Sequence, residues 1–263
     1  MKRSIFSLSL LAVLGALATA PAMAASGHSV VDFSHGMQDW YGDQAAQTGA
    51  INTSLGNGTP AFHIDDFGHG FYMKSFVNQD FLGNYTAFPA LTLSIDLTVA
   101  ELAVARPGGA ALTENFYVEL RDYDKPAVTD IYSSVYFKLG TISAAQGSQH
   151  LTVTIADTGA SALPAGWLGT GDYDASGNDV LPYGQTFGRI LGDVDEIVFG
   201  TVPPNGLTGA TVYYNVAVDN IAIQAAAVPE PAPVAMLGMG LGLLGLVAAR
   251  RRNARAAAPE GVA

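Results

Sequence analysis

The amino-acid sequence predicts an all-β protein: an antiparallel β-sandwich between an N-terminal signal peptide and a single C-terminal transmembrane helix. Three observations lead to this fold class. Apolar and polar residues alternate with a period of two along much of the interior of the chain, and clusters of Gly, Asn, Asp and Pro separate the alternating runs. No interior stretch has an apolar stripe with the 3.6-residue period of a helix. The two ends are instead long apolar runs.

The first 24 residues are typical of a secretory signal. Lys2 and Arg3 provide a basic start, and an apolar run follows at 5–18. Ala22 and Ala24 flank Met23 in the small-x-small pattern that signal peptidase accepts, which predicts cleavage after Ala24. We therefore expect signal peptidase to remove residues 1–24 and the mature protein to be exported.

The body of the chain, residues 25–227, is predicted to be one β-sandwich domain. In the run 90–99 the apolar residues from Leu91 to Val99 point to one side and the polar residues between them to the other. Phe116, Val118 and Leu120 are expected to point inward in the same way. The predicted strands are 61–65, 71–76, 90–99, 115–123, 133–139, 150–156, 196–202 and 211–224. Eight to ten strands suit two packed antiparallel sheets.

Charge and composition exclude several classes of function. The whole chain has a formal charge of −11, and the body has 6 basic against 21 acidic residues, a difference of −15. A body this acidic repels phosphate backbones, so we expect no nucleic-acid partner. The chain has no cysteine, which excludes disulfides, thiolate metal sites and cysteine nucleophiles. The acidic cluster Asp193, Asp195 and Glu196 is interpreted as solubilising surface charge.

The C-terminal part combines an acidic Pro-rich motif, an apolar run and a basic cluster. Residues 232–249 carry no charge and are long enough to cross a bilayer as a helix. The positive-inside rule places the arginines that follow on the cytoplasmic side, with the body outside. The sorting-motif residues are Pro229, Glu230, Pro231, Arg250, Arg251 and Arg252.

This order of features resembles the PEP-CTERM sorting signal of Gram-negative bacteria, here at 228–252. The resemblance implies transient anchoring in the membrane and cleavage near Pro229–Pro231 by an exosortase. It also implies residence at the cell surface or in an extracellular polysaccharide matrix. The short basic and polar tail at 253–263 is longer than is usual for this signal. An ordinary C-terminal membrane anchor is the alternative interpretation.

Three weaker motifs in the body resemble laminin-B-like and galactose-binding-like jelly rolls. They are Phe33-x-x-Gly36-x-x-x-Trp40, the segment 81–85 ahead of a strand, and the closing strand at 216–223. The resemblance implies a jelly-roll-like sandwich and leaves the function open, because this fold carries binding modules and structural domains alike.

A calcium site is predicted in the loop 172–179. Oxygen-bearing side chains at alternate positions, with Gly177 at the sixth, let a short loop surround a hard cation. The predicted ligands are Asp172, Asp174, Ser176, Asn178 and Asp179. Tyr183 occupies the position where an EF-hand loop has its last carboxylate, so Asp193 or Asp195 would have to complete the site. The alternative is a solvated turn, since turns favour the same residues.

A ligand-binding face is predicted on the polar side of two strands. Tyr117, Glu119 and Arg121 share one side of the strand 115–123, while Tyr132 and Tyr136 accompany the polar side of the next. If the two strands lie in one sheet, rings and charged groups form a platform on which sugars can stack and hydrogen-bond. The alternatives are that loops cover these tyrosines or that they are ordinary cross-strand pairs.

The sequence favours a non-catalytic function. It has neither a Gly-x-Ser-x-Gly elbow nor a His-Glu-x-x-His helix. We therefore expect an exported glycan-binding or structural module, with extracellular polysaccharide as its partner and calcium as its cofactor, if it has one. Two alternatives stay open. One is an extracellular polysaccharide-modifying hydrolase or lyase on the same scaffold, with a pair of carboxylates across a cleft. The other is a purely structural component that self-associates.

Overall fold

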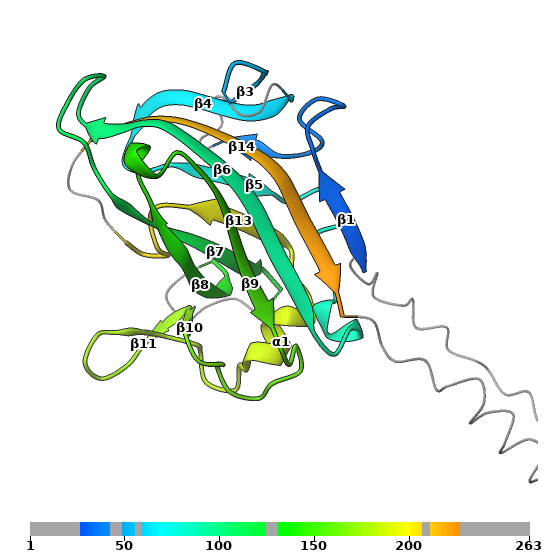
Figure 1. Ribbon diagram of the computed structural model, residues 1–263. Helices are drawn as coiled ribbons and strands as arrows, with labels where there is room; N and C mark the ends of the chain where they lie inside the picture. The colour runs from blue at the N-terminus through cyan, green and yellow to red at the C-terminus, as the bar shows by residue number, and fades with distance from the viewer. Residues whose placement is uncertain (1–26, 43–48, 56–58, 125–130, 207–210, 227–263) are drawn as a thin grey trace, which may run out of the picture.

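Two six-stranded antiparallel sheets form the body in the computed structural model, which describes residues 27–42, 49–55, 59–124, 131–206 and 211–226. Figure 1 shows β6, β9 and β14 of one sheet crossing in front of β7, β8 and β13 of the other. The predicted all-β fold class is confirmed. The predicted signal peptide and transmembrane segment, and the sorting-motif residues, lie outside the described residues.

The elements follow each other in a simple order. The strands are β1 His28–Val31, β2 Tyr41–Gly42, β3 Ala50–Asn52, β4 Ala61–Gly68, β5 Tyr72–Ser75, β6 Leu91–Val104, β7 Glu114–Asp122, β8 Ser133–Ile142, β9 Ser148–Ile155, β10 Trp167–Thr170, β11 Asp172–Tyr173, β12 Asp179–Val180, β13 Glu196–Gly200 and β14 Val212–Ala225. The helices are α1, Phe187–Leu191, and two 3₁₀ turns, Tyr85–Ala87 and Ala144–Gln146.

The first sheet has the order β3-β4-β14-β6-β9. β14 is paired with β6 along almost its whole length, while its other edge is shared by two strands. β4 pairs with the first half of β14, up to Val218, and β1 pairs with the second half, from Ile221. The register against β6 shifts between Asp219 and Ala222, where this edge changes partner. A β-bulge of this kind bends a strand and redirects its side chains.

The second sheet has the order β10-β8-β7-β13-β5-β2, so that strands far apart in the sequence become neighbours. The central strand β13 pairs with β7 on one side and β5 on the other. All five residues of β13 are buried. A strand that alternates between core and solvent would have its outward residues exposed, so part of the outer face of this sheet is covered.

The core lies between the two sheets and follows the predicted alternation. Leu91, Leu93, Ile95, Leu97 and Val99 of β6 are buried, as are Phe116, Val118 and Leu120 of β7. Val135 of β8 is also buried, whereas Phe137 and Leu139 are only partly buried. Full burial of each large apolar side chain contributes about 1.5–3 kcal/mol. Aromatic rings fill the centre: Phe116 stacks on Phe199 with ring centroids 6.4 Å apart.

A short helix, α1, closes one end of the sandwich. Phe187, Ile190 and Leu191 of this helix are buried, and the Phe187 ring meets the edge of Trp167 at 5.0 Å. The Thr186 side chain caps the helix by accepting a hydrogen bond from the Arg189 backbone N–H. Five residues are too few to produce a helical stripe, which is why the sequence pattern misses this element.

The two ends of the described body meet at one end of the sandwich. His28 of β1 lies opposite Gln224 of β14. The backbone N–H of Ala225 donates to the carbonyl of Gly27 at 2.7 Å. Both chain ends therefore leave from the same place, as Figure 1 shows.

Within the described ranges, none of the helices has the length and apolar character needed to cross a membrane.

Candidate functional site

The structure brings the predicted ligand-binding residues together on the outer face of the second sheet. β7 and β8 are neighbours, and their register places Glu119 opposite Tyr136 and Arg121 opposite Ser134. The condition that the prediction set, that both strands lie in one sheet, is therefore met. β13 extends the same face, because Glu196 lies opposite Arg121.

A network of charged side chains lies at the centre of this face. Arg121 Nη2 is 2.7 Å from Glu119 Oε2, and Arg121 Nη1 is 2.6 Å from Glu196 Oε1. The Ser134 hydroxyl donates to Glu119 Oε1 at 2.7 Å. Lys74 Nζ lies 3.4 Å from Glu196 Oε2. All four carboxylate oxygens thus have a partner, as buried charges require.

The guanidinium of Arg121 is held rigidly. Burial by itself would lower the pKa of Arg121, but the charge of Glu119 and its hydrogen bond, together with Tyr132 and Glu196, raise it above its ordinary value. The guanidinium carbon also lies 4.4 Å from the centre of the Tyr132 ring, a cation–π contact. Arg121 is therefore a fixed positive group in this face.

A hollow of about 330 Å³ opens above the network. Its lining is partly apolar, with Val198 from β13 and Val202 and Pro203 from the following loop, and the half-buried Tyr72 and Tyr132 also line it. This volume lies at the lower end of the range for ligand sites, roughly 300–1,000 Å³. Rings, apolar walls and a few fixed charged groups are the usual components of such a site.

The loop 201–206 forms one wall of the hollow and is fixed at both ends. The Thr201 hydroxyl accepts a hydrogen bond from the Phe71 backbone N–H at 2.9 Å. The Asn205 amide donates to Thr170 Oγ1 at 2.8 Å and to Asp179 Oδ1 at 3.1 Å. The loop is therefore joined to both β10 and the β11–β12 hairpin.

The centre of this face is buried. Glu119 is only 4% exposed and Tyr136 only 8%. Tyr136 lies opposite Leu168 of β10, and its ring meets the edge of the Tyr117 ring at 6.2 Å. These two tyrosines are thus cross-strand packing partners, one of the alternatives that the sequence left open, and neither Tyr117 nor Tyr136 lines the hollow. Burial raises the pKa of Tyr136, and nearby Asp179 adds to this effect.

Sequence reasoning missed two charged members of the network. Lys74 was not considered, although it is one of only six basic residues in the body. Glu196 was expected to be surface charge but is 3% exposed and paired with Arg121 and Lys74. The small number of basic residues could have indicated this network. A Lys or Arg in the middle of a strand needs an acidic partner if it becomes buried, so each of the few basic strand residues pointed to a paired carboxylate.

The predicted calcium ligands lie on the β11–β12 hairpin. Asp174 Oδ1 accepts the backbone N–H groups of Ser176 and Asn178, and Oδ2 accepts the Asn178 amide. The hydrogen bond from the Asn178 side chain is the main cause that lowers the pKa of Asp174. The described residues contain no group of three or more His, Asp or Glu side chains placed to hold a metal ion. Calcium binding by Asp172, Asp174, Ser176, Asn178 and Asp179 stays a prediction.

A family model of the PEP-CTERM protein-sorting motif matches residues 227–252. This confirms the sorting signal that Pro229–Pro231 and the three arginines predict. The chain therefore carries the motif of exported proteins that are sorted to the envelope or surface of Gram-negative bacteria. No curated protein sequence matches this chain.

Among solved structures, similar ones include carbohydrate-binding modules. The CBM22-1–GH10 part of xylanase 10B from Clostridium thermocellum, complexed with xylohexaose, has a TM-score of 0.43 and 11% identity, over 76% of this chain and 29% of that one. The family 30 module of a cellulosomal cellulase from the same organism has a TM-score of 0.41 and 12% identity, over 79% and 98%. A CBM28 module specific for non-crystalline cellulose has a TM-score of 0.32 and 10% identity, over 78% and 99%.

This chain thus spans less than a third of the xylanase chain that it matches. The identities and TM-scores are too low for these similarities to assign a function to this chain.

Proposed function

We propose that the body is a non-catalytic glycan-binding module of an exported surface or matrix protein, and that the hollow above Arg121 is its binding site. One observation carries this proposal: a ring-bordered hollow whose floor contains Lys74, Glu119 and Arg121, three members of the ion-pair network that Glu196 completes. Such a floor offers fixed donors and acceptors next to aromatic faces, which is what a polyhydroxylated ring needs.

The roles of the individual groups follow from their chemistry. The Lys74 ammonium has three protons and uses one towards Glu196, so that it retains donors for sugar hydroxyls. Its side chain is 36% exposed, against 16% for Arg121, which makes it the more accessible cation. The half-buried rings of Tyr72 and Tyr132 would stack on the C–H faces of the sugar.

The pairing of the carboxylates favours binding over hydrolysis. A glycosidase needs two carboxyl groups that face each other across the substrate and exchange protons or bonds with it. Here Glu119 and Glu196 lie on either side of a single guanidinium, and each oxygen already has a hydrogen-bond or ion-pair partner. Both carboxylates thus act as supports for Arg121 and Lys74.

The ends of the chain fit this function. Signal peptidase would remove residues 1–24 on export, the C-terminal helix would hold the protein in the membrane, and exosortase would then cleave near Pro229–Pro231. The body would be delivered to the cell surface or to an extracellular polysaccharide, which we propose as its ligand.

The test is co-sedimentation of the full chain, in mild detergent, with purified bacterial exopolysaccharides. Lys74→Met removes the accessible donor while Arg121 still neutralises Glu196. Loss of a hydrogen bond from a charged group should weaken binding by about tenfold. Arg106→Met is the matched control, because Arg106 is exposed and does not line the hollow. Equal binding by Lys74→Met and the wild-type chain would contradict the proposed site.

The same experiment tests the calcium prediction. Sedimentation with calcium and again with a chelator separates a metal-dependent module from a metal-independent one. We propose that calcium, if bound, braces the β11–β12 hairpin, which contacts the wall of the hollow through Asp179 and Asn205. In that case chelation would weaken binding, and Asp174→Ala would abolish the effect of chelation.

A further inference from the structure

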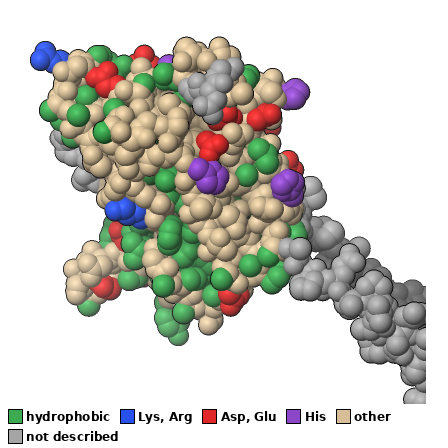
Figure 2. Space-filling model, viewed as in Figure 1, with side chains coloured by type: hydrophobic (Ala, Val, Ile, Leu, Met, Phe, Trp, Pro, Cys, Tyr) green, Lys and Arg blue, Asp and Glu red, His purple; other side chains and the backbone are tan. Residues whose placement is uncertain are grey.

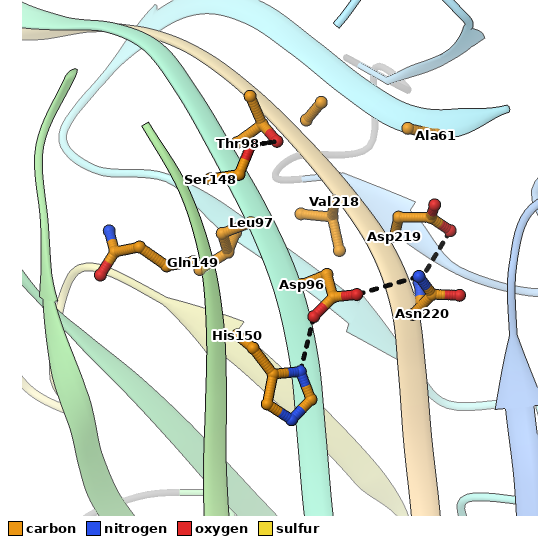
Figure 3. A pocket seen from close by; sticks show the side chains of 11 residues that line it. Ala61, Asp96, Leu97, Thr98, Ser148, Gln149, His150, Val218, Asp219 and Asn220 are labelled. Atoms are coloured by element: carbon orange, nitrogen blue, oxygen red, sulfur yellow. Dashed lines mark hydrogen bonds and ion pairs between the residues drawn. The ribbon is translucent and has the colours of Figure 1, made fainter. Parts of the chain in front are cut away.

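A second polar hollow lies on the outer face of the first sheet, at the opposite side of the sandwich. Three neighbouring strands place polar side chains in one row across it. His150 of β9 lies opposite Asp96 of β6, which in turn lies opposite Asp219 of β14. Figure 3 shows Asp96 between His150 on one side and Asn220 on the other.

The bulge in β14 shapes this row. Asn220 lies between the halves of β14 that pair with β4 and with β1, and it has a positive φ of 47°. Asn tolerates this left-handed conformation better than most residues. The Asn220 amide consequently points along the sheet and donates to Asp96 Oδ2 at 2.9 Å. A bulge that redirects a side chain is a recurrent feature of binding sites.

Asp96 also orients the imidazole of His150. Asp96 Oδ1 is 2.6 Å from His150 Nδ1, and the His150 side chain is 62% exposed. When Nδ1 carries the proton that it shares with Asp96, Nε2 presents a lone pair to a ligand. The position of the ring is thus fixed while one of its nitrogens remains available.

The hollow has a volume of about 210 Å³. Ala61 and Ala217 line the hollow among longer polar side chains, and their short side chains leave it open. The hydroxyls of Thr98 and Ser148, 2.8 Å apart, border the hollow on one side, and Asp219, whose Oδ2 accepts the Thr59 hydroxyl, borders it on the other. Hydroxyls, a carboxylate and an imidazole nitrogen together offer alternating donors and acceptors, the pattern that matches a polyol.

We infer that this hollow is a second glycan site, which binds one sugar unit of a neutral polysaccharide. The volume is below the roughly 300 Å³ at which sites for larger ligands begin, which favours a single unit. Two carboxylates border it, and none of the described residues that line it is Lys or Arg, so an acidic sugar would be repelled.

Together the two sites make the module divalent. The outer faces of two packed sheets point in opposite directions, with a core about 10 Å thick between them. One polysaccharide chain would occupy the first hollow and a second chain the other, so that the protein cross-links them. This inference rests on the proposed function for the first of the two sites.

The test uses beads coated separately with three polysaccharides: neutral xylan, neutral galactomannan and acidic polygalacturonate. The full chain in mild detergent should bind and agglutinate beads that carry a neutral chain. His150→Ala should still bind, through the first hollow, but agglutination should fall at least threefold, the effect expected from losing one hydrogen bond per site. Lys74→Met should behave alike because it loses the other site. His35→Ala is the control, since His35 is exposed and lies outside both hollows.

Asn220→Gly provides a second variant for the same hollow. Glycine accepts the positive φ, so the bulge persists while the amide that holds Asp96 is lost. Like His150→Ala, Asn220→Gly should lower agglutination below the wild-type level.

The outcomes separate the two proposals. Agglutination by His150→Ala and Asn220→Gly at the wild-type level would overturn the second site. Wild-type binding without agglutination would also overturn it and leave the first site intact. Residual binding by Lys74→Met that disappears in the Lys74→Met/His150→Ala double variant would establish it. Failure of the wild-type chain to bind either neutral polysaccharide would overturn the second site, while co-sedimentation with bacterial exopolysaccharides tests the first site separately.

Discussion

The outer faces of the two sheets are built from similar strands but have different surroundings. On the first sheet, the outward residues of β9, such as His150 and Thr152, are exposed, and those of β6, such as Asp96, are half-buried. Figure 2 shows this face with few charged side chains, among them scattered acidic and histidine side chains. On the second sheet, the outward residues Glu119 and Glu196 are buried.

The difference arises from loops that are distant in the sequence. The loop 201–206 lies over the second sheet, and Asn205 links it to the β11–β12 hairpin. Alternation along a strand shows which residues point away from the core. Whether those residues then meet water or other parts of the chain depends on tertiary contacts that alternation does not report.

The largest expected effect is on the covered face. Arg121→Met leaves the carboxylates of Glu119 and Glu196 buried without their shared cation, which should cost about 3–5 kcal/mol of unfolding free energy. On the open face, Asp96→Asn weakens an exposed hydrogen bond to His150 and should cost less than about 1 kcal/mol. Urea denaturation of both variants measures the two values. If the two variants lost the same unfolding free energy, the two faces would not differ in burial as described.

A smaller loss of stability is expected from a change in the loop 201–206, which covers the second sheet. Asn205 has a positive φ of 56°, so Asn205→Gly keeps the backbone while it removes two hydrogen bonds to β10 and the hairpin. The change should lower the unfolding free energy by about 1 kcal/mol and weaken glycan binding in the first hollow. Asn220→Gly is its counterpart on the open face and should leave binding in the first hollow unchanged. If Asn205→Gly bound glycan as the wild type does, the loop would have no part in the site.

The covered face should make the stability of the fold depend on pH in alkaline solution, through the buried phenol of Tyr136. Burial, and then Asp179, raise the pKa of the Tyr136 phenol above its ordinary value of 10.0. A raised pKa in the folded state means that the neutral phenol stabilises the fold fully below pH 10.0, and that this contribution is lost as the pH rises through the folded-state value. Tyr136→Phe should flatten the loss of stability above that pH, as followed by thermal unfolding at stepwise pH. An identical alkaline profile for wild type and variant would contradict the burial of this phenol.

Much of the fold could be predicted because buried apolar residues alternate regularly with polar ones along the long strands. The predicted strand 90–99 corresponds to β6 and 115–123 to β7, both with the expected inward residues, and 211–224 corresponds to β14. Short elements were missed, among them β10 and α1, because four or five residues do not establish a period. The bulge at Asn220 was also missed, since it results from a change of pairing partner along β14.

The candidate site was predictable only where neighbouring strands are consecutive. Glu119 and Arg121 were found with Tyr136 because β7 and β8 follow each other in the chain and pair directly. Lys74 and Glu196 were missed because β5 and β13 join them only through the order β7-β13-β5. Residues that belong to one network but lie over 100 positions apart leave no local pattern.

The most direct test of the central claim, that the covered face holds the glycan site, is hydroxyl-radical footprinting of tyrosines with and without bound exopolysaccharide. Tyr72 and Tyr132 border the hollow, whereas Tyr173 and Tyr183 are exposed and lie outside it. The account predicts that labelling of Tyr72 and Tyr132 falls on binding while Tyr173 and Tyr183 stay unchanged. Protection of Tyr173 and Tyr183 with no change at Tyr72 and Tyr132 would contradict it.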